Sequence, residues 1–345
     1  MKLEAKERTA SYQERSFADR SEDSVPLVSV VIPTYNCAQY IGETLESVLS
    51  QSYPRLEVIV VDDGSTDNTQ EVVKAYDPKR VTYLYQANSG GPAGPRNRAV
   101  QQARGRYIAL IDSDDIMLPG KIECAVRMLL QEPQLGLVFS NFVKFDAVSG
   151  QHPGTFLDTY EYFWKLPKKQ VAESQYVIRA DAAYDGLISE NYIGLSGVVM
   201  PKEVFSRIGI FDASITGPED YDMWLRIAYA YDIGFIDMIG HRYRVRLDGI
   251  TGMGDAKLVP HNIRVMQKQL SKDLPDSTHK KVHRQLARLY FALGYCHQLS
   301  EEMTLARRYY VRSLSEAHYW LSWKGLLGTL LGARLVRVLK KVRGD

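Results

Sequence analysis

Val28-Ser-Val-Val-Ile-Pro-Thr-Tyr-Asn36 contains the first strand signal in the chain, and the predicted fold is built outward from it. Residues 28–32 are largely apolar and β-branched, a pattern typical of a strand that is buried on both faces. Apolar side chains then recur at helical spacing, at Ile41, Leu45 and Val48. One face of the following segment is therefore apolar, and we expect a helix that ends near Pro54.

This strand and helix are the first of four such alternations. Buried runs at Leu56–Val61, Val81–Tyr85 and Tyr107–Ile111 predict three more strands. Asp67 is expected to cap the helix after the second strand, and a loop rich in glycine and proline, Ser89–Pro95, precedes the next helix. Alternating strands and helices predict an α/β fold, Rossmann-like, with helices on both sides of a mainly parallel sheet.

Two of the predicted strands end in clusters of acidic residues. Asp62-Asp63-Gly64-Ser65 follows the second strand, and Asp112-Ser113-Asp114-Asp115 follows the fourth. Ligands of parallel α/β sheets bind beyond the carboxyl ends of the strands. We therefore expect both clusters to face one crevice, although they are far apart in the sequence.

The second cluster, Asp112 to Asp115, brings three carboxylates to one strand end. Like charges at this separation repel, so a compensating cation is expected. Mg²⁺ and Mn²⁺ prefer oxygen ligands and are commonly held by one or two carboxylates together with phosphates. A solvated acidic turn, or the cap of a following helix, explains the cluster equally well.

Three further features carry candidate site residues. One carboxylate of the first cluster, Asp63, is suited to accept hydrogen bonds from a base or a ribose. The Asn88–Asn97 loop contains neither a dinucleotide-binding GxGxxG pattern nor a P-loop. Its Arg96 would meet a phosphate or form an ordinary surface ion pair. Asp220 opens a helix, where it would serve as a general base or only interact with the helix dipole.

The bulk composition limits the class of protein. A length of 345 residues allows one large domain, or a domain plus an appendage. A net charge of +2 argues against a nucleic-acid partner. The three cysteines are far apart, which favours a reducing compartment without disulfides. Residues 1–25 are polar and predict a disordered leader without a secretory signal. No apolar run is long enough to span a membrane, so we expect a cytoplasmic protein.

Several of these segments together resemble family 2 glycosyltransferases with the GT-A fold. The resemblance extends in order and spacing from Val28 to about Thr251, and it implies a GT-A domain over residues 26–260 followed by a helical region over 261–345. The segments that carry it are Val28–Asn36, Tyr40–Pro54, Glu57–Asp67, Gly105–Asp115 and Pro218–Arg226.

The resemblance implies a role for individual residues. Asp112 and Asp114 match the family's DxD motif, with Asp114 as a ligand of Mn²⁺ or Mg²⁺ and Asp112 directed to the ribose or the metal. Asp220 matches the catalytic base, and Asp63 would contact a uracil-type base. The residues expected to bind the donor are Pro33, Thr34, Tyr35, Glu43, Asp63, Arg96, Asp112, Ser113, Arg244 and Arg246.

The segment Gly240–Thr251 resembles a loop that often closes over the diphosphate of the donor. Many members of the family have Tyr-Arg-x-His there, followed by Ser, whereas this chain has Arg246 and Thr251. The loop keeps its basic character. The contacts that the family's histidine and serine make do not carry over.

The expected activity is transfer of a sugar from a nucleoside-diphosphate sugar to a hydroxyl of a glycan or a lipid-linked acceptor. The match at Asp63 implies a donor of the uridine type. A metal and basic residues neutralise charge on the leaving diphosphate, and one base predicts inversion at the anomeric carbon. Scattered aromatic residues in 151–195 are candidates for the acceptor side or for the core.

Two alternatives remain open. A sugar-phosphate nucleotidyltransferase needs a basic, glycine-rich loop after the first strand, where this chain has Pro33-Thr34-Tyr35-Asn36. A non-enzymatic scaffold would act through the C-terminal helices, although its acidic motifs would then have no use.

The C-terminal region contains two patterns. Leu293-Gly294, Ala306, Tyr310 and Ser313 follow the spacing of a tetratricopeptide-type helix pair. Residues 320–345 contain six Lys or Arg against one acid, together with Trp320, Trp323 and apolar residues at helical spacing. This end of the chain is expected to lie on an anionic membrane surface, as a peripheral contact, or to close the core with its apolar face.

Overall fold

We describe the fold from a computed structural model, which covers residues 17, 24–146, 148–246, 249 and 254–329. The chain forms two compact units. Unit 1 comprises Met1–Ala213 and Asp222–Val245, and unit 2 comprises Ser214–Tyr221 and Arg246–Asp345. The sequence placed the boundary at residue 261. In the structure unit 2 resumes at Arg246, and its helix α9 (Asp255–Gln267) spans residue 261.

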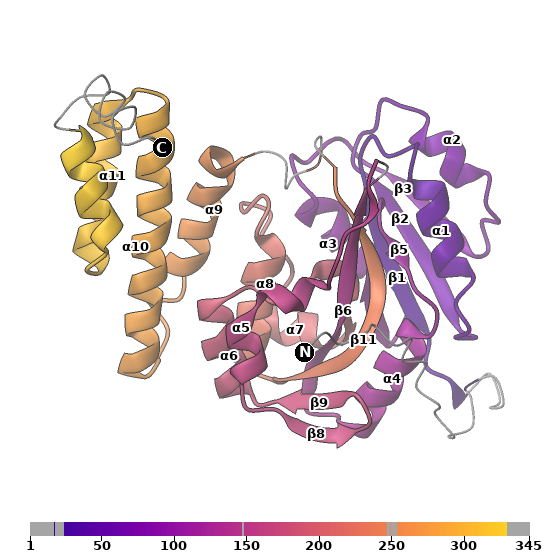
Figure 1. The fold of residues 1–345 in the computed structure, drawn as a ribbon. Coiled ribbons are helices and arrows are strands. Elements are labelled where there is room, and N and C mark those ends of the chain that lie inside the picture. Colours follow the sequence, from indigo (N-terminus) through magenta and orange to yellow (C-terminus); the bar gives the residue numbers. More distant parts are fainter. Residues whose placement is uncertain (1–16, 18–23, 147, 247–248, 250–253, 330–345) are drawn as a thin grey trace. The chain divides into compact units, whose positions relative to one another are not determined.

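Unit 1 is built on a mixed sheet, shown in Figure 1. Among the described residues the sheet has eleven strands, with the main order β3-β2-β1-β4-β10-β6-β11-β9-β8. The strands are β1 (Val28–Thr34), β2 (Leu56–Asp62), β3 (Val81–Tyr85), β4 (Tyr107–Leu110), β5 (Ile116–Met117), β6 (Leu135–Asp146), β7 (Gly150–Gln151), β8 (Lys169–Ala172), β9 (Gln175–Ile178), β10 (Val199–Pro201) and β11 (Asp232–Arg244).

The part of the sheet that the sequence predicted is parallel. β1 pairs in parallel with β2 and β4, and β2 pairs in parallel with β3. β10 joins this half antiparallel to β4, and β11 runs parallel to β6. The expected GT-A architecture, a mostly parallel sheet with flanking helices and C-terminal helices, is confirmed.

Helices of unit 1 cover the sheet; α3 packs on β1 and β2, and α4 packs on β6 and β11. The helices are α1 (Ile41–Leu49), α2 (Thr69–Lys74), α3 (Ala93–Gln102), α4 (Lys121–Gln131), α5 (Glu161–Lys165), α6 (Ala180–Ser189) and α7 (Val204–Ile208), with 3₁₀ turns η3 (Phe156–Thr159) and η4 (Leu195–Gly197). Helix α8 (Glu219–Ala228) starts in the segment assigned to unit 2 and continues in unit 1.

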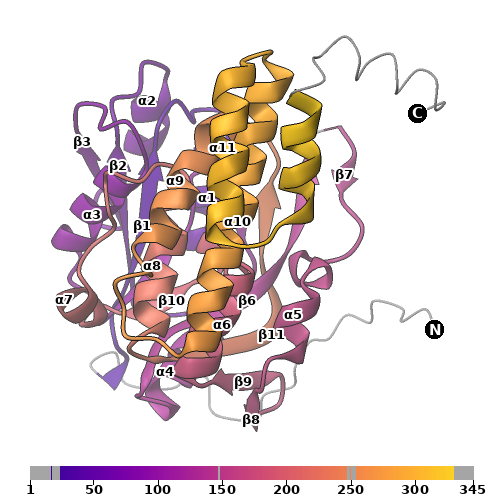
Figure 2. The ribbon, with the colours of Figure 1, turned by 90° about the vertical axis from the view of Figure 1, so that its left-hand side faces the viewer.

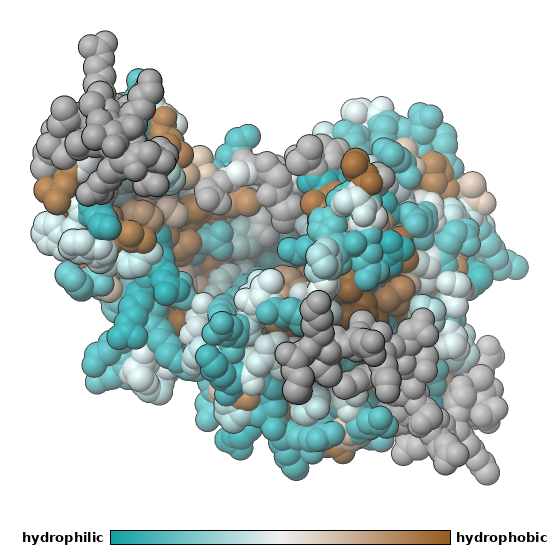
Figure 3. Space-filling view, in the orientation of Figure 1, coloured by the Kyte–Doolittle hydropathy of each residue, from teal (hydrophilic) through white to brown (hydrophobic). Residues whose placement is uncertain are grey.

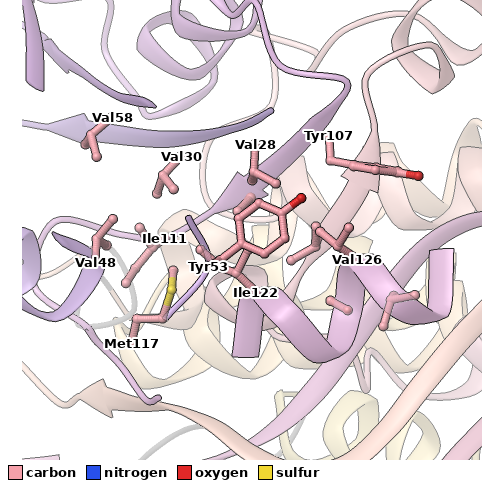
Figure 4. Packing of buried hydrophobic residues seen from close by; sticks show 14 of the residues in the cluster. Val28, Val30, Val48, Tyr53, Val58, Tyr107, Ile111, Met117, Ile122 and Val126 are labelled. Atoms are coloured by element: carbon pink, nitrogen blue, oxygen red, sulfur yellow. The ribbon is translucent and has the colours of Figure 1, made fainter. Parts of the chain in front are cut away.

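The hydrophobic core of unit 1 lies between the parallel strands and helices α1 and α4. Figure 4 shows Val28, Val30 and Val58 directed to the same interior as Ile122 and Val126 of α4. The side chains alternate along each strand, so every second residue reaches this layer.

The N-terminal leader differs from the expectation at its described residues. Phe17 and Val25 are buried in the core, so the expected loose packing is wrong at these two positions. The Phe17 ring lies edge-on to Tyr53 at 5.2 Å, and the Arg127 guanidinium lies over it at 4.8 Å. An aromatic side chain with such contacts anchors the chain despite its polar neighbours. Residues 1–16 and 18–23 lie outside the described residues.

Two local expectations are corrected. Helix α3 begins at Ala93, inside the expected loop, because Pro95 in a first helical turn needs no backbone donor. Gly240–Arg244, expected as part of a loop, is the end of β11, where His241 and Arg242 pair with β5. Two neighbouring strands satisfy the backbone there, and only Val245 onward leaves the sheet.

Unit 2 consists of α9 (Asp255–Gln267), α10 (Asp276–Leu299), α11 (Met303–Glu316) and a helical segment at residues 320–329, which we call helix 320–329. Figure 2 shows these helices side by side. Tyr310 is buried where Gly294 and Gly325 leave room for its ring, since a Cβ at either glycine would lie within 2.9 Å of it. Within the described part of the chain, every helix is too short or too polar to cross a membrane.

Candidate active site at the carboxyl end of the sheet

The ends of β1 and β2 are tied together by the residues that follow them. The Asp63 backbone N–H donates to the Thr34 carbonyl at 2.8 Å, and the Asn36 N–H donates to Ser65 Oγ at 2.9 Å. Asn36 Oδ1 accepts from the Thr66 N–H at 2.8 Å, and Asn36 has a left-handed φ of 47°, which asparagine tolerates better than most residues. The two strand ends therefore form one rigid edge.

Asp63 is buried at this edge with its carboxylate held by the loop after β3. Gln86 Nε2 donates to it at 2.6 Å, and the Ser89 N–H and Oγ donate at 3.0 and 2.9 Å. The next residue must be glycine, because Gly64 has φ +84° and a Cβ there would lie 2.8 Å from the Asn88 nitrogen. The Asp63 carboxylate is thus held in one orientation at this edge.

The end of β4 contains an ion pair between a buried arginine and a partly exposed aspartate. Arg96 Nη2 lies 2.7 Å from Asp112 Oδ1, and the Arg96 side chain is only 4% exposed. The Phe211 ring lies 5.7 Å from the guanidinium. The expectation of an ordinary surface pair at Arg96 is therefore wrong, since the guanidinium is enclosed and fixes the direction of the Asp112 carboxylate.

Asp115 is fully buried beneath the acidic turn. Burial raises the pKa of its carboxyl well above the ordinary range, and the charges of Asp114 and Asp112 raise it further. Ser196 Oγ donates to Asp115 at 2.6 Å and accepts the Asp112 N–H at 3.1 Å. Ser196 in η4 thereby links the first and last residues of the turn.

Two buried basic side chains lie under the same turn. Lys121 Nζ donates to the Ser196 carbonyl, and burial lowers the pKa of Lys121 to about 7, against the pull of Asp115. Burial, followed by the charge of Lys121, holds the pKa of His241 well below its ordinary value. The acidic turn therefore rests on a polar but solvent-free layer, where charges interact strongly.

Arg244, at the end of β11, is hydrogen-bonded to the acidic turn. Its Nε donates to the Asp114 carbonyl at 2.8 Å, and its backbone N–H donates to Asp115 Oδ1 at 2.9 Å. Its Nη2 pairs with the Glu43 carboxylate on α1, and the guanidinium lies over the Tyr40 and Phe145 rings. Arg244 and Glu43, both predicted to bind the donor, are thus engaged with each other and with the turn.

The remaining donor residues predicted in unit 1 lie at the same edge. Pro33 and Thr34 are buried at the end of β1, and Tyr35 is exposed. The Ser113 carbonyl accepts from Thr44 Oγ1 at 2.9 Å, so its backbone is held by α1. Among the described residues Thr34 Oγ1 has no hydrogen-bond partner although it is buried. A buried hydroxyl without a partner is costly and suits a site completed by a ligand.

The chain's own ligands for a metal are few. Across the described residues, no three His, Cys, Asp or Glu side chains converge closely enough to hold a metal ion by themselves. Carboxylates are present at Asp112 and Asp114, the first directed by Arg96. This donor set fits Mg²⁺ or Mn²⁺ when phosphate oxygens complete the coordination.

Asp220 and Arg246 belong to unit 2. Asp220 is partly exposed in the first turn of α8, where its Oδ1 accepts the Tyr221 N–H at 2.6 Å. Its neighbour Glu219 is buried and accepts the Gly217 N–H at 2.9 Å. Both acids therefore contact the start of their own helix, as the dipole interpretation expected. Arg246 is partly buried, and Thr251 lies outside the described residues.

Sequence reasoning missed Ser196, Lys121 and His241. They come from three distant segments, and no spacing links them to the acidic turn. The aromatic residues of 151–195 divide between the two interpretations: Phe163 is core, packed on Phe139 at 5.9 Å, whereas Trp164 is well exposed.

A hollow of about 520 Å³ lies elsewhere on unit 1. Its lining includes Tyr107, the first residue of β4, and Pro201, the last residue of β10. Because β10 runs antiparallel to β4, both residues mark the amino end of β4, opposite the acidic turn. The hollow is therefore separate from the candidate site.

Comparisons with known proteins show the family of this chain. Residues 29–183 match the family model of glycosyl transferase family 2. The putative teichuronic acid biosynthesis glycosyltransferase TuaG of Bacillus subtilis is 42% identical over 204 residues, which are 59% of this chain and 72% of TuaG. The chain belongs to glycosyl transferase family 2.

Other family 2 relatives and a solved structure extend the comparison. UDP-Glc:alpha-D-GlcNAc-diphosphoundecaprenol beta-1,3-glucosyltransferase WfgD of Escherichia coli is 27% identical over 78% of this chain and 92% of WfgD. The matches to three relatives from Streptococcus pneumoniae and two Rickettsia species span 42%, 61% and 61% of their lengths. The crystal structure of Staphylococcus aureus TarS residues 1–349 with UDP-GlcNAc has a TM-score of 0.62 at 20% identity, covering 85% of this chain and 82% of that one. This likeness shows a shared fold.

Proposed function

We propose that this family 2 protein transfers a sugar from a nucleoside-diphosphate sugar, of the uridine type, to a hydroxyl of a glycan or lipid-linked acceptor. The observation that carries the proposal is the shared edge of β1, β2 and β4. It holds a fixed carboxylate at Asp63, a hydroxyl without a partner at Thr34, and the crowded carboxylates Asp112 to Asp115.

The edge offers complementary positions to the two parts of a nucleotide. Asp63 is an acceptor for base N–H groups, and Thr34 supplies the hydroxyl that a nucleotide would engage. Asp112, directed by Arg96, would accept from ribose hydroxyls or bind the metal. Pro33, Tyr35 and Ser113 shape the same edge. The name of WfgD specifies a UDP-sugar donor, which supports the uridine type.

Asp114, together with Asp112, would hold Mn²⁺ or Mg²⁺. When bound, such an ion neutralises the charge that develops on the leaving diphosphate. The chain itself holds the turn in place, because Arg244 donates a hydrogen bond to the Asp114 carbonyl and Ser196 donates one to the Asp115 carboxylate. This support leaves the turn pre-organised for binding, so little order has to be created when the donor arrives.

Asp220 would act as the general base that removes the proton of the acceptor hydroxyl. A single base with in-line displacement inverts the configuration at the anomeric carbon. The resemblance of Pro218–Arg226 to the family's motif supports this role. The name of WfgD specifies a sugar linked to diphosphoundecaprenol, which supports a lipid-linked acceptor.

The decisive experiment is calorimetry with a panel of nucleoside diphosphates and their sugars, with and without Mn²⁺. We expect uridine compounds to bind, with an affinity that rises when Mn²⁺ is present. Asp114→Asn, which keeps the size and removes one charge, should abolish the gain from Mn²⁺ and leave the thermal unfolding curve unchanged. Equal affinity with and without metal in the wild-type protein contradicts the assignment.

The two arginines predicted for the diphosphate are best tested separately. Arg244 is hydrogen-bonded to the acidic turn, so Arg244→Ala should weaken binding of both uridine and UDP, because the whole turn loses its support. Arg246→Ala should weaken binding of UDP and leave uridine binding nearly intact. Equal losses for both ligands in Arg246→Ala would show structural damage instead of a lost phosphate contact.

A further inference from the structure

Residues 214–218, which we call the entry segment, lead into α8 along a defined course. Ile215 and Pro218 are buried. Gly217, between them, has a φ of 100°, in the left-handed region that favours glycine. The entry segment belongs to unit 2, and so does Asp220 in the first turn of α8. The course of the segment therefore determines where α8 and its Asp220 begin.

The entry segment is held by the first helix of unit 2. Residues 330–345, on which the expected membrane contact depends, lie outside the described residues, whereas α9 is described and contacts the segment through two side chains. His261 Nδ1 accepts the Thr216 backbone N–H at 3.2 Å, and Arg264 Nη1 donates to the Ser214 carbonyl at 3.3 Å. Positions i and i+3 lie on one face of a helix, so α9 holds the segment at two points.

The two contacts differ in strength. Arg264 is exposed, and hydrophilic side chains, teal in Figure 3, are prominent on the visible face of unit 2. A hydrogen bond at such a surface competes with water and contributes little. The His261 side chain is partly buried, and a backbone N–H that leaves water needs another partner. The contact between His261 and the Thr216 N–H is therefore the stronger of the two.

This contact requires one form of the His261 imidazole. A ring nitrogen that accepts a hydrogen bond carries no proton, so the ring is neutral and its proton lies on Nε2. Asparagine has an acceptor, Oδ1, bonded to Cγ as Nδ1 is in histidine, whereas leucine has an apolar side chain without an acceptor. Substitution by each in turn therefore separates the hydrogen bond from the bulk of the side chain.

The entry segment influences the reaction through Asp220. A general base acts only within hydrogen-bond reach of the proton that it removes, and a misplacement of about 1 Å can lower a rate about 10²-fold. Asp63 and Asp112, to which we assign donor binding, belong to unit 1 and lie far from the segment in sequence. Loosening the segment should therefore lower the transfer rate and leave donor binding unchanged.

We propose that His261 is a positioning residue for the transfer reaction. Its Nδ1, together with Arg264, holds the entry segment and thereby sets the place of Asp220. The proposal rests on the role proposed above for Asp220. It gives unit 2 a part in the reaction, because the first helix of this unit supports the segment that leads to the base.

The test compares His261→Leu and His261→Asn in the full chain. The probes are UDP-glucose and UDP-N-acetylglucosamine with Mn²⁺, and the rate is that of UDP release, with water in place of the acceptor. We expect His261→Leu to lower kcat about tenfold, the fold-change that corresponds to about one hydrogen bond. His261→Asn should keep kcat within about threefold of wild type, because it retains the acceptor. Calorimetry should give the same UDP affinity for both variants and the wild-type protein.

Two controls separate positioning from a general structural role. The first is His279→Leu on α10, because the His279 side chain has no hydrogen bond to any described residue. This variant should keep the wild-type kcat. The second is His261→Leu combined with Asp220→Asn. It should be no slower than Asp220→Asn alone, since both substitutions act through the same base and their effects are not additive.

Several outcomes would overturn the proposal. They are a wild-type kcat in His261→Leu, equal losses in His261→Leu and His261→Asn, and a further loss when His261→Leu is added to Asp220→Asn. If His261→Leu does not fold, the nitrogen chemical shifts of His261 in the wild-type protein replace it: a protonated Nδ1 overturns the proposal, and a bare Nδ1 coupled to the Thr216 N–H supports it. A normal rate in Asp220→Asn, or no UDP release by the wild-type protein, would instead contradict the function proposed above.

Discussion

The two ends of the strands β1, β2 and β4 are built in opposite ways. At the amino end a single carboxylate, Glu57, accepts from Ser29 Oγ at 2.6 Å, from the Arg104 N–H at 2.7 Å and from Arg104 Nε at 2.8 Å. At the carboxyl end the three carboxylates of Asp112 to Asp115 share one turn, and Thr34 Oγ1, among the described residues, has no partner.

The pKa values show the same contrast. Burial alone would raise the pKa of Glu57, but hydrogen bonds from Ser29 and Arg104 and the charge of that guanidinium hold it below its ordinary value. Burial and neighbouring carboxylates hold the pKa of Asp115 above its ordinary range. The amino end is therefore internally complete, whereas the carboxyl end contains negative charge that a cation would stabilise. The difference between them separates carboxylates that the fold itself satisfies from those that we propose bind the donor.

The largest expected effect tests whether the carboxyl end of the strands binds the donor while Asp220 supports the transfer step. Asp220→Asn should lower the transfer rate by about 10²-fold or more, because a general base is lost. We assign donor binding to the strand ends and not to Asp220. The donor affinity of the variant should therefore stay within about twofold of the wild-type value. Steady-state kinetics with the acceptor and calorimetry with UDP measure the two quantities. Near-normal turnover would reduce Asp220 to a residue of the helix terminus.

The next prediction compares how much the two aspartates of the DxD motif contribute to the free energy of unfolding. Asp112→Asn should lower the free energy of unfolding by about 1–3 kcal/mol, because the enclosed Arg96 guanidinium loses this charged partner. Asp114→Asn should change it by less than about 0.5 kcal/mol, as expected for a partly exposed side chain. Urea denaturation of both variants measures the two free energies of unfolding. The opposite ranking would show that Asp114, and not Asp112, is the structural member of the motif.

A smaller effect is expected at the amino end. Glu57→Gln should lower the free energy of unfolding at pH 7 by about 1–2 kcal/mol and leave UDP binding unchanged. Because the folded pKa of Glu57 lies below its unfolded value, its contribution is present above the ordinary carboxyl pKa and disappears as pH falls through the folded value. The stability difference between variant and wild type should therefore vanish in acid. A constant difference across pH would mean that shape, not charge, matters at Glu57.

The smallest expected effect is a rise in the free energy of unfolding together with a fall in UDP affinity. Thr34→Val replaces the buried hydroxyl without a described partner by a methyl group of similar size. The free energy of unfolding should rise by up to about 1 kcal/mol, and UDP affinity should fall about fivefold, the value of one hydrogen bond. Thermal unfolding and calorimetry measure the two changes. Lower stability in the variant would show that the hydroxyl contributes to the fold.

Prediction from sequence was strongest where a residue's neighbours along the chain determine its environment. The β-branched runs of β1, β2 and β4 identified the parallel strands of the sheet, and the acidic residues that follow β2 and β4 marked their carboxyl ends, since period and composition are local properties. The long strand β11 was missed at its end because Gly240–Arg244 is stabilised by β5 and β6, which are distant in sequence.

The sequence by itself determined the alternating fold, the position of the acidic turns and the family resemblance, because each depends on the order of residues along one segment. The tertiary structure alone decided which groups compensate the charges: Arg96 on Asp112, Ser196 on Asp115, and Arg244 on the Asp114 carbonyl. It also decided that Trp320 and Trp323 face outward. Helical spacing shows that a helix has an apolar face, but only packing against other helices determines where that face points.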